Sequence, residues 1–146
     1  MSKFVDVMEE TQSIFDNVLM NTTIPHWVQF KLISNNNQKE LYVVKKMSEL
    51  FEVLTDNLNV VIVLNEEIFD KLEDEQKKLV FEEILTGIIV NDNDKINLEK
   101  PNFTTYSSML QKHGDETMIR LKETILSLYE EKREKEIELK ENKNEK

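Results

Sequence analysis

The chain has 146 residues, with 29 acidic and 19 basic side chains, a formal net charge of −10, no cysteine, two histidines and two glycines. This length fits a single domain with a substantial core. The absence of cysteine excludes disulfides, thiolate metal sites and cysteine nucleophiles, and two glycines are too few for glycine-rich phosphate loops. Strong acidity disfavours binding to nucleic acid and to anionic membranes, so we expect neither as a direct partner.

No stretch of the sequence approaches the ~20 apolar residues that span a bilayer. The first residues, Met1 to Phe4, run directly into an amphipathic segment instead of a signal peptide. We therefore expect a cytoplasmic protein without a membrane anchor.

Helix and strand patterns alternate in the first half of the chain. Apolar residues three and four apart predict a helix over residues 3–20. Alternating patterns predict strands over 27–33 and 41–45, and the Ser/Asn turn cluster between them favours a hairpin. The run Asn-Val-Val-Ile-Val-Leu at 59–64 is β-branched almost throughout and predicts a central strand.

Two short helices are expected around this central strand. Ser48 is placed to cap the first, whose apolar residues Leu50, Phe51 and Leu54 are expected to face inward. Asn65 is placed to cap the second, over residues 66–72.

The second half of the chain is mainly helical in pattern. A broad apolar face predicts a helix over 75–90, and a short extended piece over 95–100 follows a turn. Pro101 suits the first turn of a helix over 102–112, which His113-Gly114 would end. A long helix is expected over 115–140.

These elements predict an α+β fold. Its small mixed or antiparallel sheet, a hairpin plus one central strand, is packed with several helices and followed by the long C-terminal helix. Of the 17 residues 130–146, 13 are charged. We expect them to form a charged, fraying or disordered tail behind a single domain of residues 1–129.

Five short segments stand in one order along the chain. They read Lys-Lys-Met-Ser-Glu-Leu at 45–50, Val-Leu-Asn-Glu at 63–66, Phe-Asp-Lys-Leu at 69–72, Asp-Glu-Gln-Lys at 74–77 and Lys-His-Gly at 112–114. Together, residues 27–114 resemble the phage metallopeptidase family, a zincin-like group whose members carry similar segments in this order. The resemblance implies a zincin-like fold.

The chain departs from the family at the zinc-binding helix. The family places two histidines four residues apart, with a glutamate general base after the first. The resemblance assigns Glu82 and Thr86 to the histidine positions and Glu83 to the general base. Since a catalytic zinc keeps three protein ligands, we expect no metal, no cofactor and no enzymatic activity. His113, at a helix end, is expected to interact with the helix dipole instead of a metal.

Two further expectations concern this helix. Paired carboxylates in an apolar helix need either contact with water or neutralisation by lysines. Gly87 is unfavourable within a helix and is expected to mark the close approach of another backbone.

Acidic residues concentrate around the motif: residues 66–99 contain eleven acids and four lysines, a net charge of −7. Solvated helix faces explain part of this excess. The sharper hypothesis is a docking face for a basic protein surface, with Glu66, Glu67, Asp70, Glu73, Glu82 and Glu83 as the predicted partner-binding residues.

The leading functional hypothesis is therefore a catalytically inactive, metallopeptidase-like phage protein of the host cytoplasm. It would act as an acidic protein-binding module, an inhibitor or accessory subunit of a host or phage protein complex. One alternative is an active metal-dependent peptidase or hydrolase with atypical carboxylate ligands, which would depend on Glu83. A second alternative is a structural component of the virion.

Overall fold

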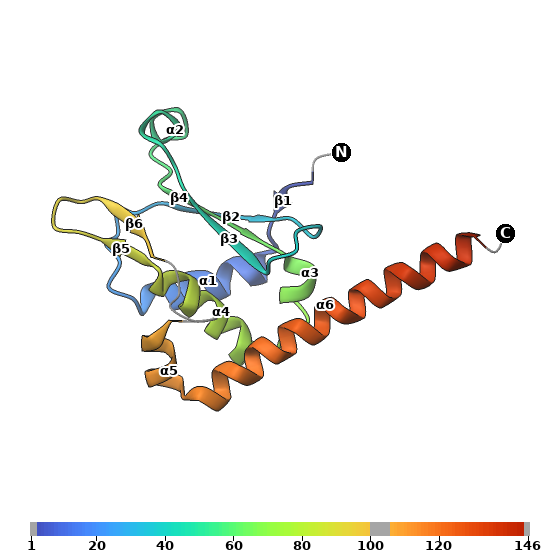
Figure 1. The fold of residues 1–146 in the computed structure, drawn as a ribbon. Helices are drawn as coiled ribbons and strands as arrows, with labels where there is room; N and C mark the ends of the chain where they lie inside the picture. The colour runs from blue at the N-terminus through green and yellow to red at the C-terminus, as the bar shows by residue number, and fades with distance from the viewer. Residues whose placement is uncertain (1–2, 100–105, 145–146) are drawn as a thin grey trace.

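The computed structural model describes residues 3–99 and 106–144, and within them the predicted α+β class is confirmed. The elements in chain order are β1 (Val5–Asp6), α1 (Glu9–Met20), β2 (Phe30–Ser34), β3 (Tyr42–Lys46), α2 (Glu49–Leu54), β4 (Val60–Leu64), α3 (Glu66–Phe69), α4 (Asp74–Thr86), β5 (Ile88–Val90), β6 (Ile96–Leu98), α5 (Ser107–His113) and α6 (Asp115–Asn144). Figure 1 shows the main sheet above α1 and α4, with α6 running beneath them.

The main sheet has the strand order β1-β2-β4-β3 and is mixed, because β4 pairs parallel with β2 and antiparallel with β3. β4 is central, as its β-branched run predicts, and Val60, Ile62 and Leu64 are fully buried. The expected hairpin pairing of β2 with β3 does not occur, because β4 lies between them. The connecting loop instead closes over the end of β4, where the Asn35 amide donates to the Leu64 carbonyl at 2.9 Å.

At two helix ends the structure has a strand where a helix is predicted. The helix predicted over 3–20 begins only at Glu9, and Val5–Asp6 pairs with β2 as an edge strand. The helix predicted over 75–90 ends at Thr86. Ile88–Val90 then forms a hairpin with β6, because β-branched residues followed by an Asn/Asp turn favour a strand over a final helical turn.

The core lies between the sheet and the helices on one of its faces. Phe15 of α1 makes edge-to-face contacts with Phe30 of β2 and Phe81 of α4, at ring-centroid distances of 5.5 and 5.3 Å. Phe69 of α3 packs on Phe81 at 4.9 Å. These contacts fix α1 against the sheet, and α4 against α1 and α3.

The short helix α2 is correctly predicted in position but not in orientation. The Ser48 hydroxyl accepts a hydrogen bond from the Phe51 amide, as expected of the cap. The inward packing predicted for Leu50, Phe51 and Leu54 is wrong, because all three are exposed. The reason is that α2 projects from the loop between β3 and β4, beyond the ends of the strands (Figure 1).

α6 packs through Met118 and Leu121, which are buried, and its second half extends past the body of the protein (Figure 1). The helix continues to Asn144, and the division into a domain of residues 1–129 and a tail stays a prediction. Within residues 3–99 and 106–144, no helix combines the length and apolar character needed to cross a membrane.

Candidate functional site

The motif residues Glu82, Glu83 and Thr86 lie on the last turns of α4. Glu73 caps the start of this helix in a capping box with Gln76. Successive helical residues are rotated by about 100°, so the two glutamates face different neighbours. Glu82 points toward α5, and Glu83 toward β3 and α6.

Glu82 is held by two basic side chains from the end of α5. The Lys112 Nζ lies 2.6 Å from its Oε1, and the His113 Nε2 lies 2.9 Å from its Oε2. The side chains of Glu82 and His113 are each about a quarter exposed. From the sequence, His113 is expected only to interact with the dipole at the helix end. The structure instead places it in direct contact with the motif, and the His-Gly pair shared with the family was the signal for this.

Glu83 is buried and paired inside the protein. Its Oε1 accepts a hydrogen bond from the Tyr42 hydroxyl at 2.7 Å and lies 2.7 Å from the Lys122 Nζ. Burial, and then the Glu83 charge, raise the pKa of Tyr42 far above its ordinary value. Lysines thus neutralise both carboxylates of the motif, one of the two outcomes that the sequence predicted.

Thr86 and Gly87 close the end of α4. The Thr86 hydroxyl donates to the Glu82 carbonyl at 2.7 Å, a bond within its own helix. A Cβ on Gly87 would lie 2.0 Å from the Tyr106 Oη and 3.1 Å from the Glu99 carbonyl oxygen. The predicted close approach of another backbone is therefore confirmed, with the Tyr106 ring even closer. Partial burial raises the pKa of Tyr106.

Two hollows meet at Glu82, one on each side of α4. The first, about 600 Å³, lies between α4 and the segment that follows α1, and contains Thr23, Thr86 and Lys112 in its wall. The second, about 350 Å³, lies between the first turns of α4 and the start of α6, and contains His113 and Thr117. Glu83 lines neither hollow.

The donors at this site do not fit the three-ligand zinc of a zincin. Glu82 and His113 are brought together, but Thr86 is turned back to the α4 backbone and Lys112 already contacts the Glu82 carboxylate. No three His, Asp or Glu side chains within residues 3–99 and 106–144 lie together so that they could hold a metal ion. A catalytic zinc with three protein ligands therefore has too few donors here.

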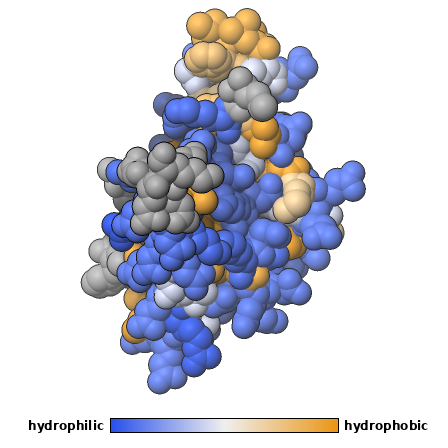
Figure 2. Space-filling view, turned by 90° about the vertical axis from the view of Figure 1, so that its right-hand side faces the viewer, coloured by the Kyte–Doolittle hydropathy of each residue, from blue (hydrophilic) through white to orange (hydrophobic). Residues whose placement is uncertain are grey.

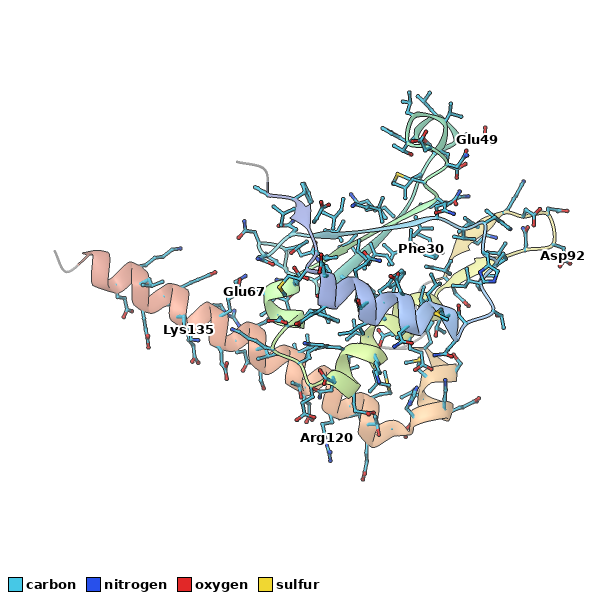
Figure 3. All side chains as sticks on the ribbon, turned by 180° about the vertical axis from the view of Figure 1, so that it is seen from behind. Phe30, Glu49, Glu67, Asp92, Arg120 and Lys135 are labelled. Carbon is cyan, nitrogen blue, oxygen red and sulfur yellow. The ribbon has the colours of Figure 1, made fainter. Side chains whose placement is uncertain are left out.

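The six acids predicted to bind a partner are dispersed. Glu66 is buried, and its carboxylate accepts a hydrogen bond from the Met8 amide at 3.0 Å. Glu83 is buried as well. The prediction that these two residues bind a partner is therefore corrected, because both lie inside the protein. Glu67 lies 3.4 Å from Lys132 of α6, and Asp70 lies 3.5 Å from Lys77. Figure 3 shows Glu67 on α3 beside α6. A role in partner binding stays a prediction for Glu67, Asp70, Glu73 and Glu82.

The model of the family described as "Putative phage metallopeptidase" matches residues 7–129. The match extends the resemblance seen over 27–114 to α1 and to the first half of α6. No curated protein and no solved structure matches the chain. The prediction that the chain is not an enzyme is contradicted by the family match, because the matched family is one of peptidases.

Proposed function

Because the chain belongs to this phage metallopeptidase family, we propose that it binds a polypeptide segment in the two hollows that meet at Glu82. The single observation that carries the proposal is the position of these hollows. They flank the helix that bears the motif, and Glu82 lines both. Binding of a polypeptide is the step that any peptidase must perform before hydrolysis.

The composition of the walls supports a polypeptide ligand. The first hollow combines the apolar side chains of Val18, Ile24 and Leu85 with two lysines. The second combines acidic and basic side chains, including Glu75 and Arg120. A nucleic acid would need a predominantly basic wall, and a small molecule would favour an enclosed apolar pocket. Mixed apolar groups and charges of both signs suit a chain of amino acids.

Hydrolysis of the bound segment is the second candidate, favoured by the contact between His113 and Glu82. A carboxylate bonded to one imidazole nitrogen fixes the tautomer, so that the other nitrogen can accept a proton. At this site, His113 would take a proton from a water molecule as its oxygen attacks the peptide carbonyl carbon. It would return that proton to the amine nitrogen as the C–N bond breaks.

One probe tests both candidates: fluorescein-labelled casein, an unfolded polypeptide. Binding is measured by fluorescence anisotropy with the full chain. The variants Thr23→Trp and Thr117→Trp each fill one hollow from an exposed position, and Ser127→Trp is the matched control at an exposed position of α6. We expect both hollow-filling variants to weaken binding at least 10-fold and the control to have no effect. Equal binding by all three variants would refute the proposed groove.

Hydrolysis is read from the same probe as the release of small fluorescent fragments. The His113→Asn variant is expected to abolish release while it retains binding, since the amide cannot accept the proton. Assays with added EDTA and with added zinc accompany the wild type. If the wild type releases no fragments under either condition, the second candidate is eliminated and the binding proposal stands on its own data.

A further inference from the structure

Helix α2 presents its apolar face to solvent. Leu50, Phe51, Val53 and Leu54 are 67, 55, 77 and 69% exposed. At 100° per residue they share an arc of about 160°, with the two glutamates of α2 on the remaining side. A surface helix ordinarily turns its apolar stripe toward the core, and here the orientation is reversed. In Figure 2 this face is the hydrophobic cap at the top of the molecule.

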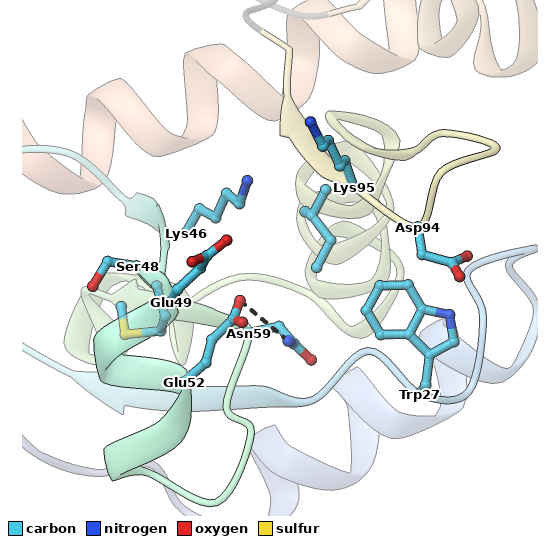
Figure 4. A pocket seen from close by; sticks show the side chains of 10 residues that line it. Trp27, Lys46, Ser48, Glu49, Glu52, Asn59, Asp94 and Lys95 are labelled. Atoms are coloured by element: carbon cyan, nitrogen blue, oxygen red, sulfur yellow. Dashed lines mark hydrogen bonds between the residues drawn. The ribbon is translucent and has the colours of Figure 1, made fainter.

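Local hydrogen bonds, not burial, hold α2 in place. The Asn57 amide donates to the Glu52 carbonyl at 2.7 Å, and the Asn59 side chain donates to the Glu52 carboxylate at 3.4 Å (Figure 4). Asp56 and Asn57 adopt positive φ angles of 54° and 68° in the turn that follows. No residue of α2 is buried. A helix of six residues is only marginally stable without packing. Contact between this apolar face and another molecule would therefore stabilise α2.

The charge of α2 and its flanking residues distinguishes between the possible binding partners of this face. Residues 47–59 contain Glu49, Glu52 and Asp56 and no lysine or arginine. A second copy of the chain would bring the same three negative charges into contact, which is unfavourable. An anionic lipid surface would repel them as well. We propose that α2 docks into an apolar groove of a partner protein whose rim carries lysine or arginine side chains.

A pocket at the base of α2 supports the proposal that the partner's rim is basic. It has a volume of about 410 Å³ and lies between α2 and the β5–β6 turn. Glu49 and Glu52 border one side and the half-exposed ring of Trp27 the other (Figure 4). The pocket is lined by three carboxylates, because Asp94 joins the two glutamates, and by two lysines, Lys46 and Lys95. A partner's arginine or lysine placed here would meet carboxylates and an aromatic face together.

This surface is separate from the hollows beside Glu82. Figure 3 shows Glu49 on α2 and Arg120, which lines one of those hollows, at opposite ends of the molecule. Docking through α2 would therefore leave the proposed polypeptide groove open. Failure of either proposal leaves the other unaffected.

The test places a photo-crosslinking amino acid at Val53 of the full chain in cells of the phage host, with the 81% exposed Met20 as the control position. The protein crosslinked at Val53 is identified and purified, and its affinity for the unlabelled chain is measured. Leu50→Asp is compared with Leu126→Asp, because these leucines are 67 and 63% exposed on different helices. Glu49→Lys tests the charge.

We expect a product at Val53 that is absent at Met20. Leu50→Asp should weaken the purified complex at least 30-fold, Glu49→Lys about 10-fold, and Leu126→Asp not at all. The affinity should also fall as salt rises from 50 to 300 mM. The proposal is overturned by a product that contains only this chain or lipid, by no product at Val53, or by a partner whose affinity ignores Leu50 and Glu49.

Discussion

The buried carboxylate of Glu83 gives the sharpest stability prediction, through the change Lys122→Met. The Lys122 ammonium and the Tyr42 hydroxyl both donate to the Glu83 carboxylate, so Glu83 links α4 to both α6 and β3. Methionine keeps most of the volume of the lysine stem and removes the charge. In the variant, the Glu83 carboxylate, whose side chain is 2% exposed, no longer contacts this lysine.

The magnitude follows from this geometry. Removal of one partner from a buried ion pair costs about 3–5 kcal/mol. The Lys122 side chain is 26% exposed, and water can replace part of its contact with Glu83. We therefore expect the free energy of unfolding to fall by about 2–3 kcal/mol. Tyr42→Phe removes one hydrogen bond to a charged group and should cost about 2 kcal/mol.

A double-mutant cycle separates the ion pair from packing. In a Glu83→Gln background, residue 83 has no carboxylate to lose its ion-pair partner. Lys122→Met should therefore lower the free energy of unfolding by less than about 1 kcal/mol. The coupling energy between the two positions should therefore reach at least ~1 kcal/mol. Urea unfolding followed by circular dichroism measures all four proteins. Additive effects of the two substitutions would refute an energetically important Glu83–Lys122 pair.

The raised pKa of Tyr42 makes the unfolded state lose its tyrosine proton first. The free energy of unfolding should therefore be fully present below pH 10 and fall above it, with a weaker fall in Tyr42→Phe, as urea midpoints from pH 8 to 11 would reveal. Gly87→Ala places a Cβ 2.0 Å from the Tyr106 Oη and should cost about 1–3 kcal/mol, less in a Tyr106→Phe background, as thermal unfolding measures. An equal cost in both backgrounds would contradict that contact. Leu50→Asp should change stability by less than about 0.5 kcal/mol, because α2 has no buried residue, and a larger loss in the same assay would mean that α2 packs on the core.

Local signals account for the parts of the fold that the sequence predicted well. The caps of Ser48 and Asn65 each depend on a side chain within three residues of the amide that it accepts. The central strand depends on one continuous β-branched run. The strand order could not be read in this way, because the parallel pairing of β2 with β4 joins segments about 30 residues apart.

The candidate site was only partly predictable for a similar reason. The resemblance to the family identifies the motif positions on α4, but the contact of His113 with Glu82 spans 31 residues. The buried Glu66 carboxylate accepts a hydrogen bond from the backbone amide of Met8, which lies 58 residues earlier in the chain. The exposure of Leu50 shows the same limit, since amphipathic spacing identifies an apolar face and not what covers it.

The central claim, polypeptide binding beside Glu82, is tested most directly by NMR. The ¹⁵N-labelled full chain is titrated with unlabelled, reduced and carboxymethylated α-lactalbumin, an unfolded polypeptide, and amide shifts are mapped onto the sequence. The largest shifts are expected in residues 18–24, 78–88 and 112–120, around the two hollows. Shifts confined to other surfaces, or no shifts at saturating polypeptide, would contradict polypeptide binding at this site.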